Sequence, residues 1–325
     1  MIEYFNNCTL QKEFHLLAFS GSAKVQLMLF TGILFTFLLA VFGNLLITTL
    51  ICLAAQLHTP MYFFLCNLAI QDIIYVSAIL PKFLIITITG DTRISFQACI
   101  AQMFLFTFCV GTEFFLLTSM AYDRYVAICV PLRYALIMNK SLCIILAVVC
   151  WLMSILNSLT YSVLISNLSY CISLDMDQFY CDLKTVLNLS SSDTTDIQIA
   201  VLVVCVVLGF FPFMLILTSY LCIIHTILKM NTSTGRAKAF SSCSSHLTVV
   251  FLFYGTSLSF YLKPASEHSQ KQDMLLSLLY TAVVPLLNPL VYSLRNKDVL
   301  RSMSIITDKY FCKQPIILLQ RVVRE

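Results

Sequence analysis

Long apolar runs recur along the chain from Val25 to Leu294, and short clusters of polar or turn-forming residues separate them. Each run approaches or exceeds the roughly 20 residues that an α-helix needs to cross the hydrocarbon of a bilayer. Seven runs can be counted, at about 25–53, 60–87, 96–130, 142–164, 197–228, 237–262 and 274–294. The pattern therefore predicts an all-α membrane protein, a bundle of seven transmembrane helices.

Composition agrees with this prediction and adds a domain organisation. Hydrophobic residues make up 59% of the 325 residues and charged residues 11%, which is far from the usage of soluble globular proteins. We expect an N-terminal segment at 1–24, a helical membrane domain at 25–294 and a C-terminal tail at 295–325. Pro81, Pro212, Pro285 and Pro289 fall within these runs, where a membrane helix tolerates the lost backbone hydrogen bond.

The distribution of charge indicates the orientation, because lysine and arginine are retained on the cytoplasmic side. With an extracellular N-terminus, most of the 20 basic residues face the cytoplasm, and one long outer loop collects Asp175, Asp177, Asp182, Asp193 and Asp196. The first 24 residues lack the compact apolar core of a signal peptide, so the first span is expected to direct insertion. The formal charge of +4 then reflects membrane topology and does not indicate nucleic-acid binding.

On the predicted extracellular side, the candidate modification and disulfide sites are one sequon and a few cysteines. "NCT" at Asn7 is an N-glycosylation sequon on the predicted outer side. Most of the 14 cysteines lie in or beside spans, where a thiol usually packs as a small apolar group. Cys99, Cys171 and Cys181 lie in the outer region, where a bond from Cys99 to the long loop would hold that loop over the bundle. No cysteine or histidine spacing indicates zinc, and neither a metal nor a cofactor is expected.

Two carboxylates, Asp72 and Glu113, fall inside predicted spans. A charge in a span is costly and is by default a functional hypothesis. With Asn44 and Asn288 as hydrogen-bond partners, the pair could hold a cation or a shared proton, or could act as a polar clamp between helices. A proton relay in a transporter is an alternative, but transporters usually show repeated halves, and the chain shows no such repeat.

Six further motifs accompany the stretch "MAYDRYVAIC" at 120–129, which places Asp123 beside Arg124 and is followed by "PLRY" at 131–134. In chain order they are "GNLLI" at 43–47, "LHTPMYFFLCNLAIQD" at 57–72, "SY" at 219–220, "KAFSSCSSHLTVV" at 238–250, "FYG" at 253–255 and "PLLNPLVYSLRNKDV" at 285–299. Together they make the chain resemble the rhodopsin-like (class A) G-protein-coupled receptors, in the version characteristic of olfactory receptors.

The resemblance implies a switch at the cytoplasmic end. Arg124 would pair with Asp123 in the closed bundle and turn toward Tyr220 and Tyr292 in the open one. The sixth helix would then swing outward and admit a helix of a stimulatory G protein. The same function is implied for Tyr125, Lys238, His246, Asn288 and Pro289. Ser242, Arg295 and Lys297 would share that rim, where basic residues also suit anionic lipid headgroups. A short amphipathic helix is expected after the seventh span.

Ligand recognition is expected at the opposite end of the bundle. Helical spacing puts five residues on one inward face of the third helix: Met103, Phe106, Thr107, Val110 and Gly111. The resemblance adds Val204, Leu208, Tyr254, Ser257, Tyr261 and Thr281. These residues are mostly apolar with a few hydroxyls and no ionisable group, which favours a small neutral volatile odorant. The family implies a plasma-membrane protein of the cilia of olfactory sensory neurons, with the lipid bilayer and the G protein as partners.

Two departures from the family pattern affect the expectations. The resemblance implies a Cys99–Cys181 disulfide, but Ser191 stands where the family places a third cysteine of the second outer loop, so Cys171 lacks its usual partner and is expected to be free. The tail after Arg301 is apolar, and its Cys312 is a candidate for palmitoylation or is free. An enzyme would need a nucleophile beside a base, for which adjacent Ser245 and His246 are the one superficial candidate. A receptor is therefore expected, not an enzyme.

Overall fold

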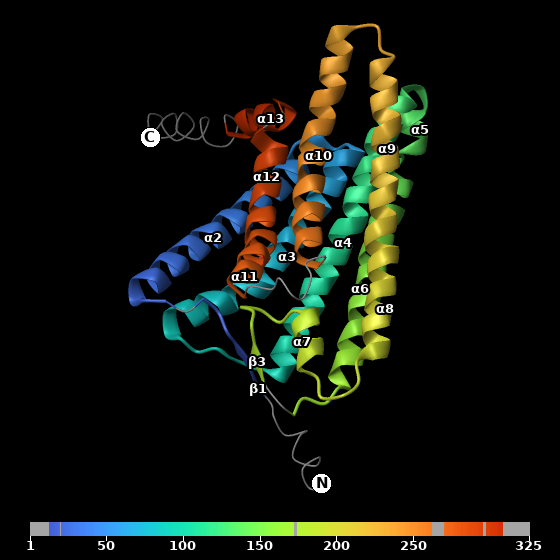
Figure 1. The fold of residues 1–325 in the computed structure, drawn as a ribbon. Coiled ribbons are helices and arrows are strands. Elements are labelled where there is room, and N and C mark those ends of the chain that lie inside the picture. The colour runs from blue at the N-terminus through green and yellow to red at the C-terminus, as the bar shows by residue number, and fades with distance from the viewer. Residues whose placement is uncertain (1–12, 20, 172–173, 262–269, 295–296, 308–325) are drawn as a thin grey trace, which may run out of the picture.

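The computed structural model describes residues 13–19, 21–171, 174–261, 270–294 and 297–307, and these form a bundle of seven transmembrane-length helical segments (Figure 1). The first four segments are single helices, α2 (Ala23–Leu53), α3 (Pro60–Thr89), α4 (Phe96–Cys129) and α6 (Lys140–Ser166). The fifth is continuous through α8 (Thr195–Cys205), η4 (Val206–Phe210) and α9 (Phe211–Leu228). The sixth is α10 (Ser233–Tyr261), and the seventh runs through α11 (Gln270–Leu278), η6 (Leu279–Val283) and α12 (Val284–Leu294).

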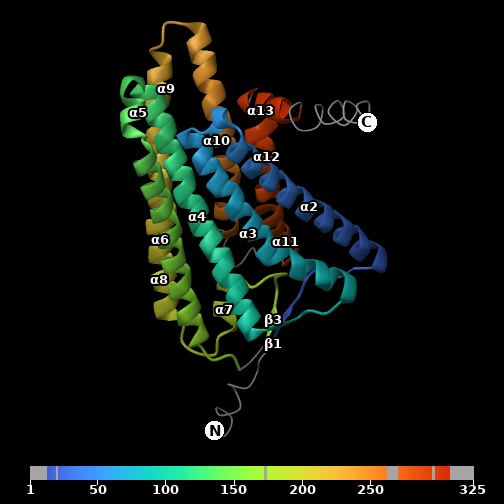
Figure 2. The same ribbon diagram turned by 180° about the vertical axis from the view of Figure 1, so that it is seen from behind.

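The predicted seven-helix membrane bundle is confirmed. Six of the described helical stretches are long and apolar enough to cross a membrane. The remaining helix, α10, is less apolar because its first half carries a serine-rich stretch that ends at His246. Outward faces of the bundle carry exposed apolar side chains such as Met28, Phe35, Leu202 and Phe211, which suits contact with lipid tails. In the centre, α4 packs against α3, α6 and α9 (Figure 2).

Prolines explain why the fifth and seventh segments are interrupted. Both η4 and η6 are π-helical turns, and each ends two residues before a proline, Pro212 and Pro285. A proline has no N–H, and its ring clashes with the carbonyl four residues earlier, which here lies inside the π turn. Widening that turn relieves the clash without breaking the segment. The sequence located these prolines, but the π turns were not predicted.

A three-stranded sheet covers one end of the bundle, which we call the sheet end; the opposite end is the Arg124 end. Its strands are β1 (Glu13–Leu16), β2 (Arg93–Ser95) and β3 (Asp175–Met176), in the order β2-β1-β3. Strand β1 pairs antiparallel with β2 and parallel with β3, with His15 opposite both Arg93 and Asp175. The all-α expectation missed these strands because two to four residues each give no readable alternation and their partners are distant in sequence.

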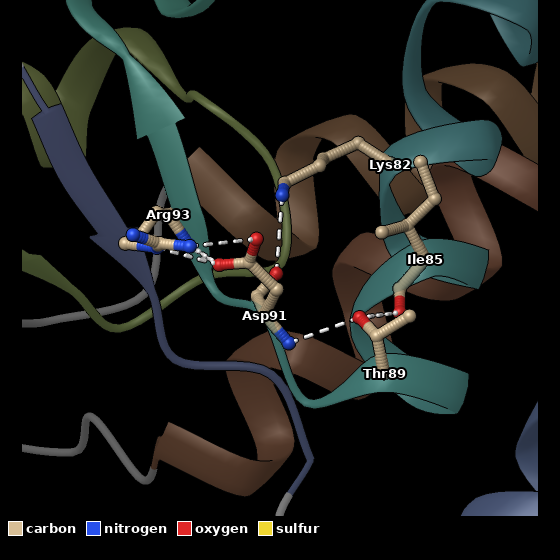
Figure 3. A network of polar contacts seen from close by, with 5 residues as sticks. All are labelled: Lys82, Ile85, Thr89, Asp91 and Arg93. Atoms are coloured by element: carbon tan, nitrogen blue, oxygen red, sulfur yellow. Dashed lines mark hydrogen bonds and ion pairs between the residues drawn. The ribbon is translucent and has the colours of Figure 1, made fainter.

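The turn that leads into β2 is held by a local polar network (Figure 3). Helix α3 ends at Gly90, whose φ of 73° is the left-handed conformation that glycine adopts without strain. Asp91 then accepts hydrogen bonds from the Arg93 side chain, at 2.9 Å from Nε, while Lys82 Nζ donates to the Asp91 carbonyl at 3.1 Å. The bonds from Arg93 lower the pKa of Asp91 to about 2. The pair is exposed, so it shapes the turn and adds little stability.

A disulfide joins the first turn of α4, at the sheet end, to the long loop that contains β3 and the short helix α7 (Leu183–Leu189). The predicted Cys99–Cys181 bond is present, and both residues are buried. The expectation that Cys171 is free is wrong, because Cys171 is disulfide-bonded too. Its partner is none of the other described cysteines, which are free or belong to the first bond. Ser191, which stands where the family places a cysteine, accepts a hydrogen bond from the Cys171 N–H at 2.9 Å.

Short helices close the Arg124 end. The turns are η2 (Ala55–Leu57) and η3 (Pro131–Arg133), and α5 (Tyr134–Ile137) follows η3 directly. The expected helix after the seventh segment is α13 (Lys297–Thr307), which lies across the end of the bundle in both views. Its Val299 and Ser302 are buried, and Gln56 donates a hydrogen bond to the Ser302 hydroxyl. One face of α13 is therefore fixed to η2. Asn7 and Cys312 lie outside the described residues.

We expect the stability of the folded protein to depend on pH through the carboxyl group of Asp182, which lies next to the disulfide. Its side chain is fully buried and caps α7 by accepting from the N–H groups of Lys184 and Thr185 at 3.1 and 3.3 Å. Burial raises the pKa of Asp182 from 3.8 to about 6 despite these bonds. The folded state therefore binds this proton more tightly than the unfolded state does. The protonated Asp182 carboxyl stabilises the folded protein fully below pH 3.8, and this contribution is lost as the pH rises through about 6.

Asp182→Asn imitates the protonated carboxyl and keeps an oxygen that can cap α7. The variant should therefore lose little stability as the pH rises, whereas the wild type loses at most about 3 kcal/mol for a shift of roughly two pKa units. The measurement is the apparent unfolding temperature of detergent-purified protein between pH 4 and 7.5. The control is Asp193→Asn, since Asp193 is an exposed carboxylate of the same loop whose pKa is lowered by hydrogen bonds from Thr195. Parallel curves for wild type and Asp182→Asn would show that this carboxyl does not govern the loop.

Candidate functional site

Three clusters of buried polar side chains lie along the bundle axis, and the first is at the Arg124 end. Asp123 is fully buried on α4, and Arg124 Nε donates to its Oδ2 at 2.9 Å, with a second contact from Nη2. The Tyr134 hydroxyl donates to Oδ1 of the same carboxylate at 2.7 Å. Burial, followed by the nearby Asp123 charge, raises the pKa of Tyr134 well above its ordinary value, which keeps the hydroxyl a donor. Both carboxylate oxygens are thus satisfied.

A second contact in the same cluster joins α4, α9 and α10. His246 is fully buried, with Nδ1 2.8 Å from the Tyr220 hydroxyl and Nε2 3.0 Å from the Leu117 carbonyl. A carbonyl can only accept, so Nε2 carries the proton, and in a neutral imidazole Nδ1 accepts from Tyr220. Ser245 donates instead to the Val291 carbonyl at 3.1 Å, which ties α10 to α12. Ser245 and His246 therefore face different partners and do not form a nucleophile–base pair.

The remaining residues predicted for this end are only partly engaged. Tyr292 is buried, and its hydroxyl has no hydrogen-bond partner among the described residues. Tyr125 is half-buried and stacks on Tyr122 with ring centroids 6.4 Å apart. The side chains of Lys238, Ser242 and Lys297, and the whole of Arg295, lie outside what the structure describes. The structure thus brings Asp123 and Arg124 into direct contact and places Tyr220 on His246.

The second cluster surrounds Asp72 in the middle of the bundle. Asn288 Nδ2 on α12 donates to Asp72 Oδ2 on α3 at 2.9 Å. Asp72 Oδ1, Glu113 Oε1, Asn288 Oδ1 and both amide atoms of Gln71 are buried without a hydrogen-bond partner among the described residues. These carboxylate and amide oxygens could accept from a shared proton or contact a bound cation. Among the described residues, no group of three histidine, cysteine or acidic side chains forms a metal site.

Asn44 belongs to this level but does a different job from the predicted one. Its Nδ2 donates to the Ala40 and Pro285 carbonyls at 3.0 and 3.1 Å. Pro289 has no N–H to offer the carbonyl four residues earlier, which is that of Pro285. Asn44 therefore supplies the hydrogen bond that the proline removes. Gly43 allows this approach, because a Cβ there would lie 3.2 Å from Cγ of Pro289. Gly43 and Asn44 of the first segment therefore pack against the seventh segment at its prolines.

The third cluster lies toward the sheet end, where ligand residues were predicted. Phe106, Ser257, Tyr254 and Thr281 are buried there, and the Tyr254 ring packs on Phe114 with centroids 5.1 Å apart. Met103 is fully buried in the core around the disulfide, where Val204 is half-buried against the same core. Val110 and Leu208 are half-buried, and Tyr261 ends α10 with a side chain outside the described part.

Two residues of the predicted inward face of α4 point elsewhere. The Thr107 hydroxyl lies 2.8 Å from that of Ser158, and a Cβ on Gly111 would lie 3.2 Å from the Ser154 hydroxyl. Both partners belong to α6. Helical spacing alone cannot identify which neighbour a buried face contacts in a helix surrounded on all sides. Thr107 and Gly111 therefore fix α4 to α6 in this structure.

Three tyrosines around Phe106, and Phe179 beside one of them, were not predicted. Tyr75 on α3, Tyr280 on η6 and Tyr180 of the long loop have ring centroids 5.8, 5.9 and 5.1 Å from that of Phe106. Phe179 stacks on Phe83 at 4.4 Å. The disulfide holds this loop inward, and the Cys181 N–H donates to Gln102 Oε1 at 2.9 Å. The only sequence signals were that Tyr180 precedes Cys181 and that Tyr75 is one helical turn from Asp72.

Comparisons with known proteins point in one direction. Residues 33–309 match the family model described as olfactory receptor. Olfactory receptor-like protein OLF3 of Canis lupus familiaris is 44% identical over 293 residues, which cover 90% of this chain and 92% of that protein. Olfactory receptor 2T5 of Homo sapiens is 41% identical over 91% of this chain and 94% of its own length. Olfactory receptor 1G1 of Gorilla gorilla gorilla is 43% identical, with 91% and 95% covered.

The Asp123 cluster makes a stability prediction that needs no ligand. Tyr134→Phe leaves Oδ1 of a fully buried carboxylate without its donor, which costs about 1–3 kcal/mol. We expect a lower apparent unfolding temperature of the purified protein. Tyr122→Phe is the matched control, since Tyr122 is 39% exposed and lies one residue before Asp123. If both variants unfold at the wild-type temperature, the Tyr134–Asp123 bond does not stabilise the folded protein.

Proposed function

The chain belongs to the olfactory receptor family, and we propose that it binds small neutral volatile molecules between its helices and activates a stimulatory heterotrimeric G protein, which raises cyclic AMP. The observation that carries the coupling part of the proposal is the buried Asp123–Arg124 pair. A buried ion pair contributes little net stability compared with an apolar pair. Its position at the end of α4, beside Tyr134 of α5, supports a switch.

In the proposed closed state, Arg124 is held by Asp123, and Asp123 is also held by Tyr134. Opening requires Arg124 to leave this carboxylate and turn toward Tyr220 and Tyr292. Tyr220 is bound to His246, so its hydroxyl must be released as α10 moves outward. The free hydroxyl of Tyr292 is available to the arginine without breaking another bond among the described residues. The open end then forms a groove for the C-terminal helix of the G protein.

The proposed ligand site is the cluster near the sheet end. Phe106, Val110, Leu208, Tyr254, Ser257 and Thr281 offer apolar surface and hydroxyl groups without a charge, which supports a neutral ligand. Met103 and Val204 lie between this cluster and the disulfide-bonded loop, and Tyr261 continues the same helix beyond Ser257. A ligand that binds the open arrangement better than the closed one shifts the population toward signalling.

The cluster around Asp72 would bias this equilibrium. Asp72, Glu113 and Asn288 leave several buried oxygens without partners, and we propose that these oxygens hold a cation or share a proton. Asn288 connects the carboxylate of α3 to α12 just before Pro289. Asn44 stabilises the same kink from α2. Movement of α12 would therefore change the surroundings of both carboxylates.

The proposed orientation places the sheet end outside the cell and the Arg124 end in the cytoplasm. It puts Asn7 on the side where glycosylation occurs, and the amphipathic α13 on the side where it can lie at the lipid surface. This arrangement fits a multi-pass protein of the plasma membrane, with olfactory cilia as its proposed location. Lys238 and the basic residues around α13 would then contribute to the rim that meets the G protein or anionic lipid.

The proposal predicts opposite phenotypes for two adjacent residues. Asp123→Asn weakens the closed state but keeps the arginine that the open state uses; a loss of about 1.4 kcal/mol raises the ratio of open to closed receptor roughly tenfold. Arg124→Ala removes the group that completes the open groove. Ligand-free cyclic AMP should therefore rise in Asp123→Asn and fall to background in Arg124→Ala.

The measurement is cyclic AMP in transfected cells with and without an odorant panel, normalised to surface-labelled receptor. Arg133→Ala is the control, because Arg133 lies on the same end and is exposed. Silence of both Asp123→Asn and Arg124→Ala at normal surface levels would mean that Asp123 is required for coupling and that the switch is wrong. A wild-type response to an odorant that survives in Arg124→Ala would contradict the G-protein mechanism.

A further inference from the structure

A group of buried hydroxyls near the sheet end lacks hydrogen-bond partners. The side-chain oxygens of Tyr75, Ser257, Ser277 and Tyr280, here called the hydroxyl cluster, are buried and have no hydrogen bond to any described residue. Each side chain is more than nine-tenths buried. A buried hydroxyl without a partner costs about 1–3 kcal/mol. Four such groups from three helical segments therefore indicate a polar site rather than a packing accident.

The members converge from three parts of the bundle. Tyr75 lies on α3, Ser257 on α10, Ser277 on α11 and Tyr280 on the π turn η6. The Tyr280 hydroxyl lies near the side chains of Tyr75 and Ser257, in contacts that fall short of full hydrogen-bond geometry. The Tyr75 and Tyr280 ring centroids are 6.0 Å apart. Single π turns inside α-helices occur frequently at functional sites. Here the turn carries the residue at the centre of the cluster.

The surroundings define what could bind. Phe106 and Tyr180 pack beside Tyr75 and Tyr280 and provide a flat apolar surface. The acidic groups that interact electrostatically with these tyrosines are Glu113, for both, and Asp182, for Tyr280. Acidic neighbours disfavour an anionic ligand. Hydroxyl groups that lack an acceptor are best satisfied by an oxygen that accepts two hydrogen bonds and brings no donor of its own. A carbonyl oxygen has two lone pairs and meets this requirement.

We propose that the hydroxyl cluster is the hydrogen-bonding part of the ligand site, and that it selects neutral ketones, aldehydes or esters whose apolar bodies lie against Phe106 and Tyr180. This inference rests on the proposed function and names its ligand class. It places the polar recognition point between α3, α10 and the seventh segment, with Ser257 as the member already predicted from the sequence. Tyr75, Ser277 and Tyr280 are additions to the residues predicted from the sequence.

Tyr280→Phe separates binding from folding. The substitution removes a hydroxyl that has no partner in the free protein, so the apparent unfolding temperature without ligand should stay equal or rise. It also removes a donor to the ligand, so the concentration of ketone needed for half-maximal effect should rise at least tenfold, since sites built to hydrogen-bond a polar group discriminate strongly on that group. Tyr75→Phe and Ser257→Ala should act in the same direction. Tyr161→Phe, a buried tyrosine on α6 outside the cluster, is the control.

The probes are straight-chain methyl ketones from pentan-2-one to decan-2-one, cyclohexanone and acetophenone, each beside the hydrocarbon of the same skeleton. Binding is read as the rise in unfolding temperature of the purified receptor, and signalling as cyclic AMP in cells. Ketones should stabilise the wild type more than their hydrocarbons, and Tyr280→Phe should abolish that difference while Tyr161→Phe keeps it.

The two readouts keep two failures apart. Stabilisation by ketones without any cyclic AMP response would support the ligand site and contradict the proposed signalling. Cyclic AMP responses to odorants that are unchanged in Tyr280→Phe, Tyr75→Phe and Ser257→Ala would overturn the hydroxyl cluster and leave the signalling intact. If the substitutions reduced the stabilisation by ketone and by hydrocarbon equally, they would act on the shape of the site and not on a hydrogen bond, which would contradict the hydroxyl cluster. If no ketone stabilised the wild-type receptor, the proposed ligand class would be wrong.

Discussion

Inside the hydrocarbon of a membrane, every backbone N–H and C=O must find its partner within the protein. The rest of this structure follows from that constraint. Uninterrupted helices satisfy it in five segments, and π turns preserve it where Pro212 and Pro285 interrupt the fifth and seventh. Where Pro289 leaves the Pro285 carbonyl without its donor, Asn44 of another helix supplies one. Serine and threonine hydroxyls mostly follow the same rule by donating to the carbonyl one turn earlier, as Thr112 does to Phe108.

Buried polar side chains that do not bind a nearby backbone carbonyl are the functional candidates. The Asp123–Arg124 pair, the carboxylates of Asp72 and Glu113, and the hydroxyls around Tyr280 lie at three levels of one bundle. The helices link these levels: α4 carries Arg124 and Glu113, and η6 and α12 carry Tyr280 and Asn288. A ligand near Tyr280 would thus act on the same segment whose asparagine binds Asp72. We infer that movement of the seventh segment couples the ligand site to the cytoplasmic end.

The sequence predicted the helical segments to within a few residues, because lipid contact makes each span apolar along its whole length. It also predicted the Cys99–Cys181 bond and the contact between Asp123 and Arg124 through family motifs. It could not predict Tyr134 as the second donor to Asp123, since that contact depends on how η3 turns the chain back. Thr107 and Gly111 were placed on the ligand face, but they pack on α6 because spacing does not identify a neighbour. The strands depend on contacts between segments distant in sequence.

In the proposed switch, the Asp123–Arg124 pair favours the closed bundle, in which α10 lies close to the other helices. The direct measurement is the distance between spin labels at Ser141 on α6 and Arg236 on α10, both exposed, in purified receptor whose exposed cysteines 52, 205 and 222 are replaced. We expect a short distance in wild type without ligand, and a longer one both in wild type with odorant and in Asp123→Asn without it. An unchanged short distance in Asp123→Asn, with odorant still lengthening it in wild type, would contradict the claim.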